Sequence, residues 1–270
     1  MIDEDMQRYY ERGRERERLT RGGGTLELVR TQELLQRYLP PPPADVLDVG
    51  GGPGVYAAWL ARAGYRVHLV DPMPLHVGQA AEAAAAQPNH PFTAAVGDAR
   101  RLDEPDASCD AALLFGPLYH LTERTERIAA LTETRRVLRP GGIARVMAIS
   151  RFGSLLDGVR QGYLGDPEAA QVIEETLLSG QNWSPGLEHF PNWFTTSFFH
   201  LPAELVAEVT ESGFTLETFI GIGGPGGFVG TGWDDPHQRP HILRAARMVE
   251  QEASLLGLSP HLLAVARKRR

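Results

Sequence analysis

The chain has 270 residues and a formal net charge of −7, which argues against a general nucleic-acid-binding surface. Its single cysteine, Cys109, excludes an internal disulfide and a multi-cysteine metal site. No apolar run approaches the roughly 20 residues of a membrane-spanning helix, and the acidic start lacks the apolar core of a signal peptide. We therefore expect a soluble, cytoplasmic protein, monomeric or homodimeric, that does not bind nucleic acid or membranes.

Residues 1–39 precede the regular part of the chain and are predicted to form a helical cap. Alternating charges over residues 3–20 indicate a helix with a solvated face, and Gly22–Gly24 should break it. Apolar residues at helical spacing predict a second helix over residues 26–38. Residues 40–43 are all proline and form a stiff extended connector.

Short apolar segments alternate with helical segments from residue 44 to residue 150. Strands are predicted at residues 46–49, 66–70, 92–96, 111–115 and 143–149. Helices are predicted over residues 56–63, after Pro74, and after Thr122, which should cap its helix. Residues 139–142 should turn the chain into the fifth strand. This alternation indicates βαβ units around a parallel sheet.

The alternation stops between residues 151 and 200, where aromatic residues and glycines are frequent. A segment this long is unusual as a simple connection in a compact fold, so we expect an inserted helical and aromatic lid. The remaining residues, 201–270, should complete the same domain. They are predicted to form a helix from Pro202, a strand over 214–222, a glycine-rich segment, a helix over 242–256 and a last strand over 261–266.

A glycine-rich loop follows the first predicted strand. Its form is Asp-x-Gly-x-Gly-x-Gly from Asp48 to Gly54, and Gly50, Gly52 and Gly54 let the backbone approach a ligand closely. Open α/β sheets bind ligands where parallel strands end. A dinucleotide loop would need its last glycine at Val55. The spacing therefore favours the amino-acid half of S-adenosylmethionine over a pyrophosphate.

Two acidic residues end the next two predicted strands. Asp71 follows the second strand, where a carboxylate accepts hydrogen bonds from ribose hydroxyls. Its alternative interpretation is a helix cap before Pro72. Asp98 follows the third strand, where an acceptor can take the adenine amino group. Its alternative interpretation is a solvated turn residue.

Together these residues resemble the class I S-adenosylmethionine-dependent methyltransferases, in particular the small-molecule branch that includes methyltransferase type 11. The resemblance covers residues 44–150 by motif and the remainder by strand order. It implies an α/β fold with a doubly wound, seven-stranded, mainly parallel sheet whose last strand is reversed. It also implies a set of cofactor contacts: Gly50, Gly52 and Gly54 with the methionine part, Asp71 and Pro72 with the ribose, Asp98 and Ala99 with adenine, and Phe115 and Gly116 beside the sulfonium.

The segment that leaves the fourth strand reads Phe115-Gly-Pro-Leu-Tyr-His120. It departs from the Asn/Asp-Pro-Pro-Tyr of enzymes that methylate amino groups of nucleic acids and some proteins, which argues against a nucleobase or glutamine acceptor. The segment also lacks the carboxylate expected of a magnesium-dependent catechol methyltransferase, so no metal is expected.

Several residues are candidates for contact with the acceptor or the cofactor. His120 is the first candidate base because it follows the fourth strand and can titrate near neutrality, although it could equally start the next helix. Tyr119 is expected to position the substrate, and His200 is a second candidate base. In similar enzymes N-terminal segments close over the cofactor, which implies that role for Tyr10 and contact between Arg18 and the methionine carboxylate. A surface or packing role is the alternative for Tyr10 and Arg18.

The predicted function is in-line methyl transfer to a small, partly apolar or aromatic acceptor, with N-, O- and C-methylation all open. A base is needed only if the acceptor must lose a proton. One alternative is a non-catalytic or regulatory protein that binds S-adenosylmethionine on the same fold. Another is a nicotinamide-dependent oxidoreductase, against which Val55 argues. A macromolecular acceptor would need a basic groove, and none is evident.

Overall fold

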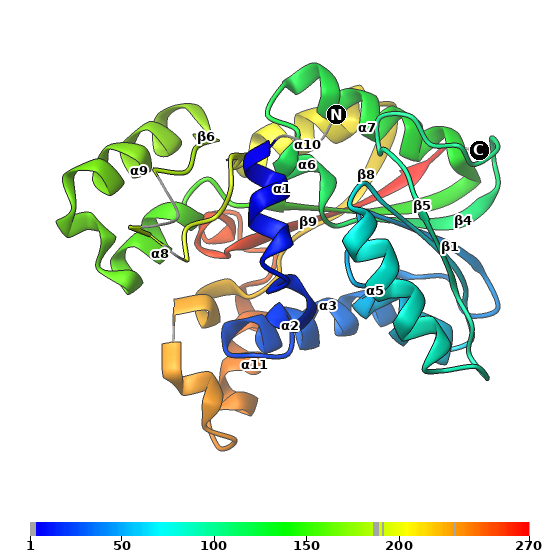
Figure 1. Cartoon of the computed structure of the whole chain (residues 1–270), viewed down its shortest axis with the longest axis horizontal. Coiled ribbons are helices and arrows are strands. Elements are labelled where there is room, and N and C mark those ends of the chain that lie inside the picture. Colours follow the sequence, from blue (N-terminus) through cyan, green and yellow to red (C-terminus); the bar gives the residue numbers. More distant parts are fainter. Residues whose placement is uncertain (1–3, 186–188, 191, 229, 270) are drawn as a thin grey trace.

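A seven-stranded sheet forms the centre of the computed structural model, which describes residues 4–185, 189–190, 192–228 and 230–269. The strand order is β3-β2-β1-β4-β5-β9-β8, and helices cover both faces (Figure 1). The strands are β1 Asp45–Val49, β2 Arg66–Asp71, β3 Thr93–Val96, β4 Cys109–Leu114, β5 Leu138–Ile149, β8 Phe214–Gly221 and β9 His261–Lys268.

Strand direction follows the predicted pattern. β1 to β5 pair in parallel, as Val46 opposite Val67 and Ala111 illustrates. β9 runs antiparallel to both of its neighbours, β5 and β8. The central strands read as nearly continuous apolar runs because both of their faces are covered by helices. The doubly wound, mainly parallel sheet with a reversed last strand is thereby confirmed.

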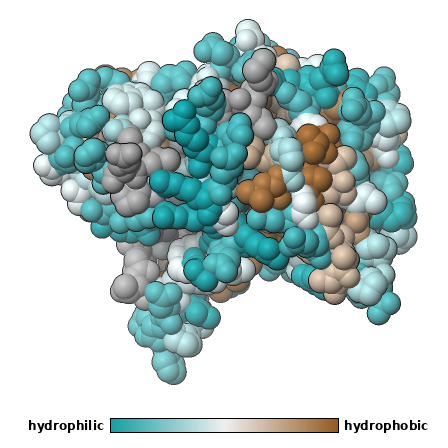
Figure 2. Space-filling view, in the orientation of Figure 1, coloured by the Kyte–Doolittle hydropathy of each residue, from teal (hydrophilic) through white to brown (hydrophobic). Residues whose placement is uncertain are grey.

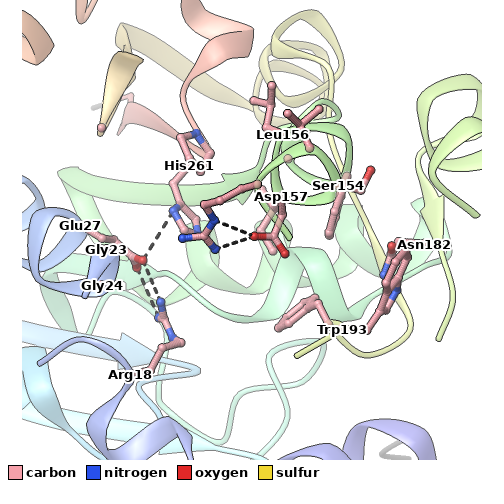
Figure 3. Close-up of a pocket in the computed structure, with 18 of the residues that line it drawn as sticks. Arg18, Gly23, Gly24, Glu27, Ser154, Leu156, Asp157, Asn182, Trp193 and His261 are labelled. Carbon is pink, nitrogen blue, oxygen red and sulfur yellow. Dashed lines mark hydrogen bonds and ion pairs between the residues drawn. The ribbon is translucent and has the colours of Figure 1, made fainter. Parts of the chain in front are cut away.

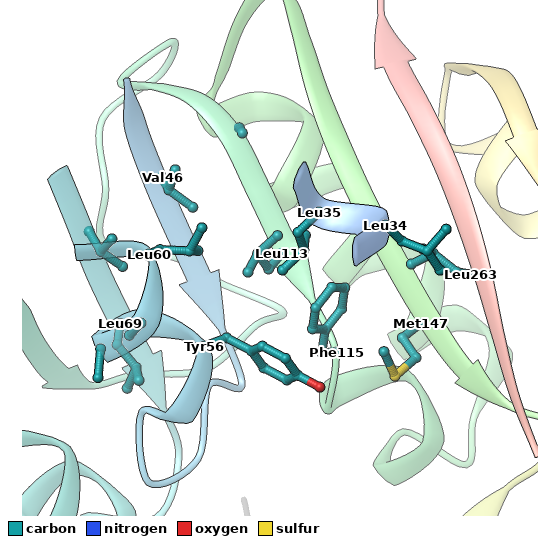
Figure 4. Close-up of a cluster of buried hydrophobic side chains, with 14 of the residues drawn as sticks. Leu34, Leu35, Val46, Tyr56, Leu60, Leu69, Leu113, Phe115, Met147 and Leu263 are labelled. Carbon is teal, nitrogen blue, oxygen red and sulfur yellow. The ribbon is translucent and has the colours of Figure 1, made fainter. Parts of the chain in front are cut away.

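Two apolar layers hold the helices to the sheet. On one face lie α3 (Gly23–Tyr38), α4 (Val55–Arg62) and α5 (Pro74–Ala85), and on the other lie α7 (Arg124–Val137) and α10 (Pro202–Glu211). Figure 4 shows the first layer, in which Leu34 and Leu60 meet the sheet residues Leu69, Leu113 and Leu263. Each fully buried leucine contributes about 1.5–3 kcal/mol to the free energy of unfolding.

The N-terminal helices differ in detail from the sequence prediction. The expected single helix is divided into α1 (Glu4–Glu11) and α2 (Glu15–Arg18), because Gly13 between them adopts a φ of 69°. The glycine run does not separate the helices completely, since α3 begins at Gly23. α1 crosses the edge of the sheet (Figure 1) and buries Met6 and Tyr10 against Met73.

Two local predictions around the fourth and fifth strands were wrong. Residues 139–142 lie within strand β5 rather than in a turn, and the irregularity appears as a register shift between Cys109 and Ala111 of β4. Thr122 does not cap a helix, because α7 begins at Arg124 with Glu123 as its N-cap. Instead, the backbone carbonyl of Thr122 accepts a hydrogen bond from Arg127.

The segment between β5 and α10 forms its own substructure at one end of the molecule (Figure 1). It contains α8 (Gly153–Gln161), the 3-10 turn η1 (Tyr163–Gly165), α9 (Pro167–Ser179) and a two-stranded sheet of β6 (Gln181–Asn182) and β7 (Ser197–Phe198). Asp166 caps α9 with its side chain. A small core of Ala169, Val172, Ile173, Phe190 and Trp193 holds the segment together.

One helix, one helical turn and three 3-10 turns complete the elements that the structure describes. They are α6 (Pro117–His120), α11 (Arg239–Val249) and the 3-10 turns η2 (Gly224–Phe228), η3 (Gly230–Asp234) and η4 (Leu256–Leu258). The face in Figure 2 is largely hydrophilic, with its apolar residues gathered over the region of α5. Within the described ranges, no helix is both long and apolar enough to cross a membrane.

Candidate functional site

A cavity of about 940 Å³ opens at the edge of the sheet where β1, β2, β3 and β4 end. We call it the strand-end cavity. The carboxyl ends of parallel strands share one edge, so residues far apart in the sequence meet here. From the strand ends it is lined by Gly50, Gly52, Asp71, Pro72, His76, Asp98, Ala99, Gly116, Tyr119 and His120, and from the N-terminal segment by Met6, Tyr10 and Glu15.

The three glycines of the loop have different environments. Gly50 has a φ of +71°, and a Cβ there would lie 2.5 Å from Pro117 Cδ, so only glycine fits. Gly52 also has a positive φ, +56°, but a Cβ there would meet only Glu15 Cγ, at 4.0 Å. Gly54 packs toward α5 and does not line the cavity, unlike the expectation for it. Its left-handed conformation instead begins α4.

Asp71 joins the end of β2 to the glycine loop. Its buried carboxylate accepts hydrogen bonds from the backbone N–H of Gly52 at 2.9 Å and of Met73 at 2.9 Å. Its Oδ1 also lies 3.1 Å from Nδ1 of His76, a cavity residue that the sequence analysis did not single out. His76 could have been identified from the sequence by its position in the first turn of the helix that follows Asp71. Three contacts therefore hold this carboxylate in one orientation.

Asp48 lies beneath the loop rather than in the cavity. Its carboxylate is buried, and neither oxygen has a hydrogen-bond partner among the described residues. Burial, together with the charge of Asp71, raises the pKa of Asp48 to about 7. A Cβ at Gly51 would lie 2.7 Å from Asp48 Oδ2, so this side chain supports the loop from below.

Asp98 and Ala99 both line the cavity, but the carboxylate of Asp98 already has a partner. It accepts hydrogen bonds from the backbone N–H and from Nε of Arg100, both at 2.9 Å. Arg100 also pairs with Glu126. The hydrogen bonds from Arg100 hold the pKa of Asp98 below its usual value. Arg100 and Glu126 could not be predicted from the sequence, because their pairing joins the segment after β3 to the first turn of α7.

Tyr10, Tyr119 and His120 meet on one wall of the cavity. The hydroxyl of Tyr10 lies 2.6 Å from His120 Nε2, which ties α1 to α6. Burial lowers the pKa of His120 to about 4 and raises the pKa values of both tyrosines above their usual range. The ring of Phe194 packs against both Tyr119 and His120. His120 is therefore neutral at physiological pH, with one ring nitrogen occupied.

Three other predicted site residues lie outside the strand-end cavity. Phe115 turns into the core, where its ring centroid is 5.4 Å from that of Tyr56. His200 is fully buried with its Nε2 3.2 Å from Glu208 Oε2, and Arg127 pairs with the same carboxylate at 2.8 Å. This network is a structural one between α7 and α10, and it explains why a histidine is buried there.

Arg18, the third of these residues, lines a second cavity of about 610 Å³. Its guanidinium donates to Glu15 at 2.8 Å and to Glu27 at 2.7 Å. We call this the aromatic cavity because its walls include Tyr163, Trp193, Phe194, Phe199 and Trp233. Figure 3 shows it, with Arg18, Glu27 and His261 on one side and Asp157, Asn182 and Trp193 on the other. Within the described part of the chain, no group of three or more His, Cys, Asp or Glu residues is placed to hold a metal ion.

Part of the chain is similar in sequence to known methyltransferases. Residues 46–142 match the family described as Methyltransferase domain. An uncharacterized methyltransferase of Mycobacterium sp. strain JLS is 36% identical over 130 residues, which cover 46% of this chain and 47% of that protein. The chain thus spans about half the length of the curated relatives it matches.

Two solved structures share the fold at 20% identity. A SAM-dependent methyltransferase of Methanosarcina mazei superposes with a TM-score of 0.61 over 87% of this chain and 97% of its own. The cyclase SpnF superposes with a TM-score of 0.57 over 90% of this chain and 80% of its own. At this level of identity the likeness extends to the fold alone.

Proposed function

We propose that the chain is a class I S-adenosylmethionine-dependent methyltransferase and that it transfers a methyl group from that cofactor to a small-molecule acceptor; the match of residues 46–142 to a methyltransferase domain supports this proposal. The reversed strand β9 argues against a nicotinamide-dependent oxidoreductase, whose sheet is typically parallel. One observation carries the proposal. At Gly52 the backbone faces open space in the strand-end cavity, directly beside the buried carboxylate of Asp71.

The residues around the strand-end cavity fit S-adenosylmethionine. The cavity volume, about 940 Å³, lies within the range of small-molecule sites. Gly50 and Gly52 would hold the methionine part, Asp71 with Pro72 the ribose, and Asp98 with Ala99 the adenine. Gly116 would lie near the sulfonium. Gly54 and Phe115 would not contact the cofactor; Gly54 would shape the glycine loop, and Phe115 would pack in the core behind the cavity. When bound, the cofactor supplies a methyl group already activated by a positively charged sulfur.

The main contribution of the chain is then orientation. Asp71 is held by Gly52, Met73 and His76 before any ligand arrives, so little reorganisation is needed on binding. The Tyr10–His120 hydrogen bond closes α1 over the cavity and helps to exclude water. Tyr119 lines the same wall. His120 would act as a positioning residue, since Tyr10 occupies its Nε2 and its pKa of about 4 makes it a weak base.

The proposal gives each segment of the chain a role. Residues 1–39 would form a helical cap on the cofactor, and residues 44–150 the cofactor-binding half. Residues 151–200 would form a lid over the acceptor, with residues 201–270 completing the domain. Support for the lid comes from Trp193 and Phe194, which line the aromatic cavity beside the strand-end cavity. The net charge of −7 supports a small-molecule acceptor over nucleic acid.

Calorimetry with S-adenosylmethionine and S-adenosylhomocysteine tests the cofactor assignment. The wild-type chain should bind both, and release of S-adenosylhomocysteine in the presence of an acceptor mixture would demonstrate transfer. Absence of binding would refute the proposal. Binding without transfer would favour a non-catalytic role or a different reaction, an alternative suggested by the fold's likeness to a protein named as a cyclase.

A further inference from the structure

The aromatic cavity lies next to the strand-end cavity and is separated from it by one layer of side chains. Arg18 lines the aromatic cavity and pairs with Glu15, which lines the strand-end cavity. Phe194 lines the aromatic cavity and packs against Tyr119 and His120 of the strand-end cavity. Arg18 can release Glu15 without losing all ionic partners, because Glu27 also holds it. Rotation of the Glu15 and Phe194 side chains would be needed to join the two cavities.

The walls of the aromatic cavity carry no uncompensated charge among the described residues. Arg18 pairs with Glu27, and Arg160 pairs with Asp157 at 2.5 Å. The remaining charged residue, Arg21, pairs with Glu17. A charged ligand would lose its hydration here without gaining an ionic partner, which is costly. The cavity therefore favours a neutral ligand, and its five aromatic residues favour one with an aromatic ring.

Two polar groups on these walls remain available to a neutral ligand. Ser154 Oγ is buried and has no hydrogen-bond partner within the described chain. His261, at the start of β9, lies with its Nδ1 3.6 Å from Glu27 Oε2 (Figure 3). A carboxylate beside Nδ1 favours the tautomer that carries its proton there. Nε2 of His261 is then a proton acceptor in a cavity otherwise lined mainly by apolar groups.

From this arrangement we propose that the aromatic cavity binds a neutral aromatic acceptor with a hydroxyl group, and that His261, oriented by Glu27, removes its proton. The inference rests on the proposed function. The acceptor oxygen forms a bond to the methyl carbon while the carbon–sulfur bond breaks, and sulfur keeps that electron pair. The hydroxyl proton passes to Nε2 of His261, so charge and atoms balance.

The titration of His261 depends on the groups that face it. Burial lowers the pKa of His261, and the charge of Glu27 opposes that shift. Arg18 lowers the pKa further and Glu15 raises it, both from the N-terminal segment, while Asp157 and Arg160 of α8 lie across the cavity. The pKa of His261 thus lies below the usual 6.5, so His261 is neutral near pH 7, as a base must be.

Binding of matched naphthalene derivatives tests the acceptor class without turnover. Calorimetry with 1-naphthol, 1-naphthoate, 1-naphthylmethylammonium and 1-methoxynaphthalene, at saturating S-adenosylhomocysteine, should give the tightest binding for 1-naphthol, by about tenfold. Trp193→Ala should weaken that binding, whereas Trp183→Ala, outside the cavity, serves as the matched control. Equal or tighter binding of a charged derivative would overturn the assignment of a neutral acceptor.

The rate of 1-methoxynaphthalene formation tests the role of His261. His261→Gln should lower the single-turnover rate by about 10²–10⁴-fold and abolish the rise of that rate with pH below about 6.5. His90→Gln, at the opposite edge of the sheet, should keep both the rate and the profile. An unchanged pH profile in His261→Gln, or no methylation of 1-naphthol by the wild type, would overturn the inference. S-adenosylhomocysteine affinity, measured separately, shows whether the cofactor assignment survives either result.

Discussion

Substituting alanine for Gly52 separates the cofactor role of the glycine loop from its role in folding. Gly52 has a φ of +56°, and a Cβ there would have no atom closer than Glu15 Cγ at 4.0 Å. The methyl group would therefore occupy cavity space without displacing the protein. Gly50 offers no such separation, because a Cβ there would lie 2.5 Å from Pro117 and force the wall to move.

The expected magnitudes follow from these two environments. A left-handed alanine costs about 1–2 kcal/mol of folding free energy. For a chain of this size that corresponds to a drop in Tm of about 2–8 °C. A methyl group inserted into a close contact with a ligand costs about 1–3 kcal/mol, which is about a 5- to 150-fold loss of affinity. Binding should thus weaken even in protein that remains fully folded.

The assay is calorimetric titration of S-adenosylhomocysteine, with thermal denaturation of the same samples. Gly162→Ala is the matched control, since Gly162 has a φ of +76°, open space around its Cβ position and no place in either cavity. It should lose a similar amount of stability and keep wild-type affinity. If Gly52→Ala also keeps wild-type affinity, the loop does not cradle the cofactor and the reasoning fails.

Three further predictions concern single carboxylates and a histidine. Asp71→Asn should weaken S-adenosylhomocysteine binding, measured by calorimetry, by about 10- to 100-fold because charge-assisted hydrogen bonds are lost. The exposed Asp106→Asn is the control. Equal affinities of the two variants would contradict the assignment of Asp71 to the ribose. The folded-state pKa of His120 lies at about 4, below the unfolded value of about 6.5, so unfolding takes up protons in this window and Tm should fall as pH drops through it. His120→Gln should show a shallower fall, and a parallel one would count against a buried neutral imidazole. Glu208→Gln should lower the free energy of unfolding, measured with denaturant, by about 3–5 kcal/mol because Arg127 loses its carboxylate partner, whereas the exposed Glu211→Gln should lower it by less than about 1 kcal/mol. The methylation rate of the folded Glu208→Gln protein should stay unchanged. A lost rate would indicate that His200, which pairs with Glu208, takes part in the reaction.

The sequence alone determined the sheet and the position of its ligand-binding edge. Runs of apolar residues separated by helical segments are local patterns, and a parallel sheet is the arrangement that buries them. The loop from Asp48 to Gly54 was equally readable, because positive φ angles require glycine whatever the surroundings. Asp71 and Asp98 followed from the strand ends, since the topology brings those ends to one edge.

Only the tertiary structure decided which side chains face the cavities and which partners they take. Phe115 turns into the core, Arg18 pairs with Glu27, and His200 pairs with Glu208, although each stands in a segment that suggested a site. Tyr10 and His120 are 110 residues apart and meet across a cavity. The physical reason is that burial and pairing depend on long-range packing, whereas sequence patterns report local conformation. The aromatic cavity could not be predicted from the sequence either, because its walls come from the N-terminal cap, the segment after β5 and the start of β9.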